Sequence, residues 1–62
     1  MCLSTIYINK KDKDSILARD VARFRMEDGQ WVFTDIIGSE YRFRGNITDA
    51  DLTGGYVIVC DK

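Results

Sequence analysis

The first two residues, Met1 and Cys2, carry donor atoms that could hold a metal ion. The Met1 amine, the Cys2 amide nitrogen and the Cys2 sulfur follow one another along the chain, and each neighbouring pair closes a five-membered chelate ring. An amine, a deprotonated amide and a thiolate in one plane suit square-planar Ni(II) or Cu(II). The alternative is that Cys2 is a small apolar residue at the start of a strand. A site of this kind needs no histidine, and the chain contains none.

A second cysteine, Cys60, lies near the other end of the sequence. Two cysteines are too few for the disulfide framework of a secreted domain, so we expect a reducing compartment and place the protein in the cytoplasm. Cys60 could supply a further sulfur, form a disulfide with Cys2, or pack against the core. Because it alternates with Tyr56 and Ile58 in an apolar segment, we favour the packing role.

Four arginines in two alternating pairs raise the alternative of RNA binding. Together with nearby aromatic side chains they could contact phosphates and stack on bases. Against this, nine basic and ten acidic residues give a net charge of -1, without the basic excess of a nucleic-acid binder. Cross-strand ion pairs such as Asp35 with Arg42 would explain the arginines without a ligand, and we do not favour RNA as a partner. The residues concerned are Arg23, Arg25, Arg42, Arg44, Trp31, Phe33 and Tyr41.

No other group of residues assembles a catalytic site. Asp49, Asp51 and Asp61 could bind a hard cation or act as acid and base, but aspartate is also favoured in turns for its local hydrogen bonds. The chain has no GxGxxG, Walker or CxxC motif. It also has no apolar run near the roughly 20 residues that cross a bilayer. We therefore expect a protein that is not an enzyme and does not enter a membrane.

The elements that must position these residues are predicted to be strands. Apolar, β-branched segments are separated by turn residues, and only one helical turn could fit, at 48–52. Five short strands in 62 residues predict a single all-β domain over 1–62, a small SH3-like or Sm-like barrel. If its first and last strands pair antiparallel, Cys2 and Cys60 lie near one rim. The expected strands are 3–9, 21–27 (with a short piece at 16–18), 31–37, 41–47 and 56–60.

Asp28-Gly29 is the strongest hairpin signal, but two registers are open. A two-residue turn pairs Glu27 with Gln30 and places Trp31 and Phe33 on the face of the preceding strand's Phe24 and Met26. A three-residue turn with a glycine bulge reverses the second strand and turns the same two aromatic residues outward. The second register would expose a large apolar patch of the kind found at protein interfaces.

The order of several blocks along the chain is fairly specific: Met1 to Tyr7, Asp20-Val21-Ala22, Thr34 to Gly38, Gly45, Ile47 and Asp51-Leu52. Together these blocks resemble the CooT family of small proteins. Some members are linked to nickel insertion into carbon monoxide dehydrogenase, and others are catalogued only as predicted RNA-binding proteins. The resemblance implies an SH3-like or Sm-like barrel that forms homodimers, with one Ni(II) at the dimer interface built around Cys2.

The residues and the resemblance together predict a metal carrier or accessory factor. We expect one Ni(II) per homodimer through Cys2, with Met1 as an additional donor and a nickel enzyme such as carbon monoxide dehydrogenase as the client. The chelate within one chain and the site shared by two chains are different geometries, and the sequence does not choose between them. The alternative function is a small interaction module without a metal, with RNA as its ligand.

Overall fold

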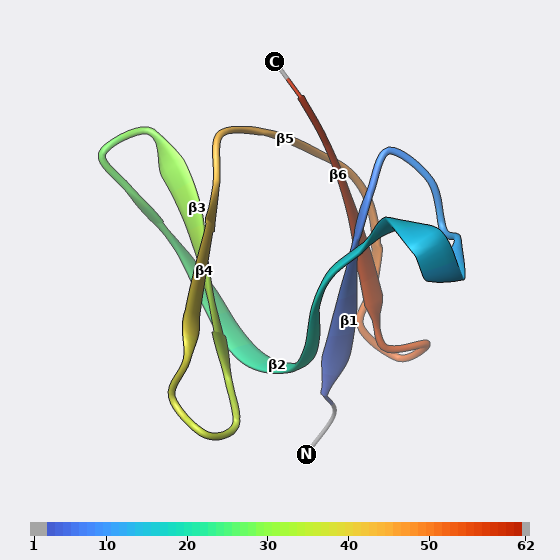
Figure 1. Ribbon diagram of the computed structural model, residues 1–62, viewed down its shortest axis with the longest axis horizontal. Coiled ribbons are helices and arrows are strands. Elements are labelled where there is room, and N and C mark those ends of the chain that lie inside the picture. Colours follow the sequence, from blue (N-terminus) through green and yellow to red (C-terminus); the bar gives the residue numbers. More distant parts are fainter. Residues whose placement is uncertain (1–2, 62) are drawn as a thin grey trace.

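The computed structural model describes residues 3–61, which are all-β apart from one 3₁₀ turn (Figure 1). The all-β prediction is therefore confirmed, although six strands are present where five were expected. The elements in chain order are β1 (Ser4–Ile8), η1 (Lys13–Ser15), β2 (Ile16–Glu27), β3 (Gln30–Asp35), β4 (Glu40–Phe43), β5 (Gly45–Asp51) and β6 (Tyr56–Asp61).

The six strands form one sheet in the order β4-β3-β2-β1-β6-β5. Neighbouring strands are antiparallel except β1 and β6, which are parallel. Within residues 3–61 no ladder joins the two edge strands, β4 and β5, so the sheet is not closed into a barrel. The predicted five-stranded SH3-like or Sm-like barrel is thus wrong in its strand count, and its closure is not observed. No helix in this part of the chain is long and apolar enough to span a membrane.

Strand β2 bends sharply near its middle. The segments 16–18 and 21–27, which the sequence suggested as separate strands, form one strand of 12 residues. Asp20 has a φ of 54°, and the register shifts on both sides of it, so extra residues are accommodated in β2 as bulges. Consequently the first half of β2 pairs with β1 and the second half pairs with β3. Figure 1 shows the resulting V shape, with the bend at the bottom.

The predicted strand 41–47 is divided at Arg44 into β4 and β5. A Cβ on Gly45 would clash with the carbonyl oxygen of Cys60 and lie 2.8 Å from Cε2 of Phe43. Only glycine therefore lets the backbone pass this close to β6. The chain crosses here from one edge strand of the sheet to the other, which makes the sheet curl around its core.

The Asp28-Gly29 turn adopts the two-residue register. Both residues have positive φ, 53° and 78°, as a type I′ hairpin turn requires. Glu27 pairs with Gln30, and further along the ladder Phe24 pairs with Phe33. The three-residue alternative is therefore wrong. The aromatic residues of β3 face the core side of the sheet, and Phe33 is fully buried.

The core lies between the two halves of the curled sheet. Its buried members come from β1, β2, β3 and β6, and they are all apolar. Among residues 3–61 no polar or charged residue is buried. The buried cluster consists of Ile6, Ala18, Val21, Phe33, Val57 and Val59.

The parallel pairing of β1 with β6 corrects the expected position of Cys60. Thr5 pairs with Tyr56 and Ile8 with Val59, so Cys60 lies beyond the last residue of β1. The expectation that Cys2 and Cys60 share a rim required antiparallel pairing of these strands, and that premise is wrong. Parallel β1–β6 pairing brings together residues about 50 positions apart, which the local pattern of the sequence does not encode.

Candidate functional site

The predicted metal donors, Met1 and Cys2, lie outside the described residues. Leu3, the first of the described residues, lies immediately before β1, and the residues around it form the surroundings of the predicted site. Three segments gather there, and we call this region the basal end of the molecule. They are the start of β1, the β3–β4 turn (36–39) and the β5–β6 turn (52–55), which all lie in the lower part of Figure 1.

The ladder of hydrogen-bonded strands fixes how these segments lie relative to one another. Val21 pairs with Ser4 on one side and with Asp35 on the other. Two strand spacings therefore separate the start of β1 from the end of β3, about 10 Å. On the opposite side of β1, the amide nitrogen of Thr5 donates to the carbonyl oxygen of Gly55 at 2.8 Å. The β3–β4 turn and the β5–β6 turn thus flank the start of the chain.

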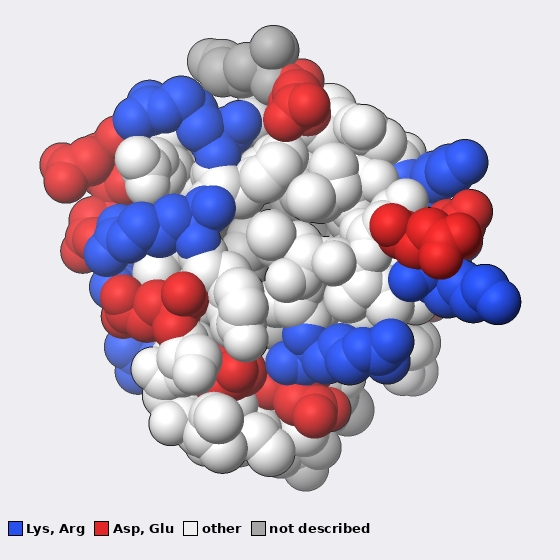
Figure 2. Space-filling view, in the orientation of Figure 1, with Lys and Arg blue, Asp and Glu red and all other residues white. Residues whose placement is uncertain are grey.

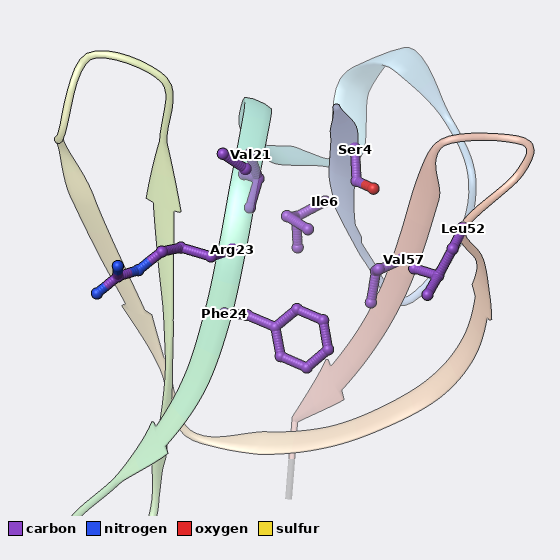
Figure 3. A pocket seen from close by; sticks show the side chains of 8 residues that line it. Ser4, Ile6, Val21, Arg23, Phe24, Leu52 and Val57 are labelled. Atoms are coloured by element: carbon purple, nitrogen blue, oxygen red, sulfur yellow. The ribbon is translucent and has the colours of Figure 1, made fainter. Parts of the chain in front are cut away.

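An apolar groove of about 340 Å³ opens beside the start of β1. Figure 3 shows the side chains of Ile6, Phe24, Val57 and Leu52 arranged around it, with the Ser4 side chain at its upper border. Two of these residues are exposed in spite of their size: Phe24 keeps 44% and Leu52 62% of its surface in solvent. The groove therefore has a floor in the core and an exposed apolar rim, which is the composition of a binding surface.

The β3–β4 turn presents a second apolar feature, which we call the isoleucine tip (Ile36 and Ile37). Ile36 is 58% and Ile37 83% exposed, and neither belongs to the core cluster. Asp35 holds the turn: its Oδ1 accepts from the amide nitrogens of Ile37 at 3.1 Å and Ser39 at 2.9 Å. Its Oδ2 accepts from the Tyr41 hydroxyl at 3.2 Å. The tip is therefore exposed but conformationally fixed.

Two of the arginines proposed for RNA binding, Arg25 and Arg42, lie on the opposite face of the sheet from the aromatic residues proposed with them. Arg25 and Arg42 flank Val32 in the ladders, on the face of the sheet opposite the ladder pair Phe24 and Phe33. On that face Arg42 lies 3.0 Å from Glu27. The aromatic rings pack towards the core instead, where Phe24 and Trp31 meet edge to face at 5.6 Å.

The charged cluster on that face is Arg25, Glu27, Glu40 and Arg42, joined by four ion pairs. A hydrogen bond from Arg42, followed by the charge of Arg25, lowers the pKa of Glu27 below its ordinary value. The cross-strand ion pairs expected from the sequence are therefore present, but Arg42 pairs with Glu27 and Glu40. Asp35, the partner that the sequence suggested, is engaged in holding the β3–β4 turn.

The carboxylates at the other edge of the sheet make local contacts. Asp51 Oδ1 accepts from the Gly54 amide nitrogen at 2.7 Å, as expected of a turn aspartate. Asp49 accepts from the Tyr56 hydroxyl at 3.4 Å, and its charge is the main cause of the raised pKa of Tyr56. No group of three or more His, Cys, Asp or Glu side chains between residues 3 and 61 could hold a metal ion. Cys60 is half-buried on β6, opposite Asn46.

Comparison with known proteins gives a family and a fold. The family model described as "CO dehydrogenase accessory protein CooT" matches residues 1–60. Among solved structures, the chain is similar to a crystal structure from Carboxydothermus hydrogenoformans provisionally assigned as CooT. The TM-score is 0.85, with 15% identity and 98% of each chain covered. No curated protein matches the chain.

Proposed function

Because the chain belongs to the CooT family of CO dehydrogenase accessory proteins, we propose that it carries Ni(II) for a nickel enzyme, carbon monoxide dehydrogenase being the first candidate. The observation that supports this proposal is the family match, which includes the first two residues. In this role the protein is an accessory factor and catalyses no reaction itself. It acts in the cytoplasm, where reducing conditions keep a carrier thiol free.

Cys2 and Met1 hold the metal in this proposal. Their amine, amide nitrogen and thiolate fit the ligand preferences of Ni(II). The absence of any candidate cluster of metal-binding side chains within residues 3–61 supports assigning the donors to the chain start. Because the thiol must lose its proton to bind, affinity should fall as the pH drops.

We further propose that two copies share one Ni(II) across a twofold axis. The apolar groove supports this, because it opens beside Ser4, two positions after Cys2. Two residues span at most about 7 Å. A twofold contact over the groove would therefore place two Cys2 thiolates close to each other and to the axis. The exposed side chains of Phe24 and Leu52 would be buried by that contact.

An absorbance titration of the reduced protein with Ni(II) tests the proposal. The unmodified chain should develop a thiolate-to-nickel charge-transfer band, and Cys2→Ser should lack it. Cys60→Ser is the matched control, since it removes the chain's other thiol, and it should titrate normally. Saturation at one metal per two chains supports the shared site, whereas saturation at one per chain supports the chelate within one chain. Absence of a band at neutral pH would refute nickel binding.

A further inference from the structure

We infer that the isoleucine tip (Ile36 and Ile37) of one copy packs against the β5–β6 turn of a second copy, at Leu52 and the adjoining rim of the apolar groove. The inference rests on the twofold contact proposed above, and it names the segments that complete that contact. Both segments lie at the basal end, one on each side of the groove, and both present exposed aliphatic side chains.

The isoleucine tip and the β5–β6 turn lie at opposite ends of one row of paired residues. In this row Asp35 pairs with Val21, and Val21 pairs with Ser4. The amide nitrogen of Thr5, next to Ser4, donates to the carbonyl oxygen of Gly55 in the β5–β6 turn. Three strand spacings, about 15 Å, therefore separate the two turns along the curved sheet. The groove opens between them, since Ser4 and Val21 both line it.

A twofold axis through the middle of this row exchanges its two ends. Rotation about such an axis places the isoleucine tip of each copy on the β5–β6 turn of the other, so the contact is made twice. A second copy thus brings to the tip a surface of matching chemistry, because it carries both the exposed side chain of Leu52 and the groove beside it. Figure 3 shows Leu52 and Val21 on opposite sides of this groove.

The chemistry of the two turns is that of the inside of an interface. Residues 36–39 and 52–55 contain no charged side chain, whereas the loop at 9–15 contains five. The carboxylates that precede the two turns are engaged locally, because Asp35 and Asp51 each accept from the backbone of their own turn. Of the five exposed large hydrophobic residues among residues 3–61, four lie in the tip, the β5–β6 turn or the groove. Depletion of charge distinguishes the centre of an interface from the remaining surface.

The size of a stable contact also extends it to both turns. A specific interface takes about 600–1,000 Å² from each partner, which is about 15–25% of the 4096 Å² that this chain exposes. A contact of this size over the groove must include the segments that border it. The tip is one of them, because the Ile36 amide nitrogen donates to the carbonyl oxygen of Asp20, next to Val21. Ile37, 83% exposed, and Leu52, 62% exposed, are buried by such a contact.

An exchange of charges tests whether the tip meets the partner's turn. The variants are Ile37→Lys, Leu52→Asp and the double variant, all at exposed positions, and sedimentation in the presence of a chelator measures their self-association. Each single variant should associate at least about tenfold more weakly than the unmodified chain. The double variant should associate more strongly than either single variant, because each of the two contacts then joins opposite charges.

Met26→Asp is the matched control, since Met26 has a similar exposure (52%) but lies on β2 next to the β2–β3 turn. Alone it should leave self-association unchanged, and combined with Ile37→Lys it should restore nothing. Both results are expected because Met26 lies outside the contact.

Each other result overturns the inference. Normal self-association of Ile37→Lys would take the tip out of the contact. A double variant that associates as weakly as the two separate losses predict, or more weakly, would show that the tip and the partner's turn do not meet, as would equal recovery with Met26→Asp. In that case a weakened Leu52→Asp still supports the proposed contact over the groove. A chain that stays monomeric would overturn the inference and the twofold sharing of Ni(II) together, whereas nickel binding itself is measured separately, in the titration.

Discussion

Replacing Asp35 should both loosen the β3–β4 turn and destabilise the whole fold. One carboxylate accepts two backbone N–H bonds within the turn and one bond from the Tyr41 hydroxyl on β4. The first two bonds resemble the capping of a helix by aspartate, for which substitution by alanine costs about 0.5–2 kcal/mol. The third is a part-buried hydrogen bond worth about 0.5–1.5 kcal/mol.

Taking the middle of both ranges, Asp35→Ala should lower the free energy of unfolding by about 2 kcal/mol. A chain of this length has a total of only about 3–9 kcal/mol. For so small a domain, 1 kcal/mol lowers Tm by about 4–8 °C, so we expect a decrease of about 8–16 °C. Asp35→Asn keeps an oxygen for the two backbone donors but loses the charge at Oδ2, and should cost about 1 kcal/mol.

The assay is urea unfolding of both variants and of Tyr41→Phe, combined with an alkaline titration of tyrosine absorbance. The hydrogen bond to Asp35, together with its negative charge, raises the pKa of Tyr41 above 10.0. The protonated Tyr41 hydroxyl, which donates to Asp35, therefore stabilises the fold below about pH 10. This stabilisation is lost as the pH rises through the raised pKa of Tyr41. Asp35→Asn should lower the pKa of Tyr41 towards its ordinary value, because the hydrogen bond to Asp35 and its charge are the main causes of the increase.

Two results would refute this account of the turn. A loss smaller than about 0.5 kcal/mol in Asp35→Ala would mean that the hydrogen bonds do not hold the turn. Strict additivity of Asp35→Asn and Tyr41→Phe would mean that the two side chains are not coupled, because partners in one hydrogen bond give a non-zero interaction energy in a double-mutant cycle.

Three further substitutions test other parts of the structure. Gly45→Ala should destabilise the chain to urea by about 2 kcal/mol or more, because its methyl group would meet a backbone carbonyl oxygen of β6 that has little room to move; an unchanged midpoint would contradict the corner geometry. The hydrogen bond from Arg42 lowers the pKa of Glu27 below its ordinary value of 4.5. The Glu27 carboxylate therefore stabilises the fold above pH 4.5, and this stabilisation is lost as the pH falls through the lowered pKa. Glu27→Gln should therefore flatten the decrease of Tm below about pH 4.5, and an identical acid profile would show that the ion pairs contribute nothing. If two copies meet over the apolar groove, as we propose, Leu52→Asp should weaken their self-association at least tenfold in sedimentation while Met26→Asp leaves it unchanged, and equal association of the two variants would contradict a contact over the groove.

The parts of the fold that the sequence predicted are those set by neighbouring residues. Asp28-Gly29 between two apolar segments predicted the β2–β3 hairpin, but the pattern left its register open. The two-residue register requires positive φ at Asp28, which the structure has (53°), and this register lets Phe24 pack against Phe33. An isolated glycine within a strand pattern is a known sign of close backbone approach. Gly45 carried that signal, which could have divided the segment 41–47 correctly.

The features that the sequence did not predict depend on contacts between residues far apart in the chain. The segment 48–51 contains residues that are poor strand formers, yet it continues β5, because an edge strand with one solvated face tolerates them. Arg42 pairs with Glu40 because both lie on the face of Val32 and Thr34. Asp35 follows Thr34 on β3 and so lies on the other face. For the site, the sequence suggested Met1 and Cys2 as metal donors, and this prediction falls outside the described residues. The sequence did not reveal that the isoleucine tip lies at the same end of the molecule as the start of β1. The bend of β2 produces this proximity.

The parallel pairing of β1 with β6 has a consequence for how the chain folds. Every other ladder joins strands that follow one another in sequence, whereas this one closes a loop of about 50 residues between Thr5 and Tyr56. Relative to a tight hairpin, the closure entropy of such a loop is larger by about 2 kcal/mol. Folding should therefore be slow for a protein of this size and limited by the meeting of the two terminal strands. The start of β1, next to the residues that would hold the metal, would then acquire its neighbours on β6 only in the last step, although its pairing with β2 can form earlier.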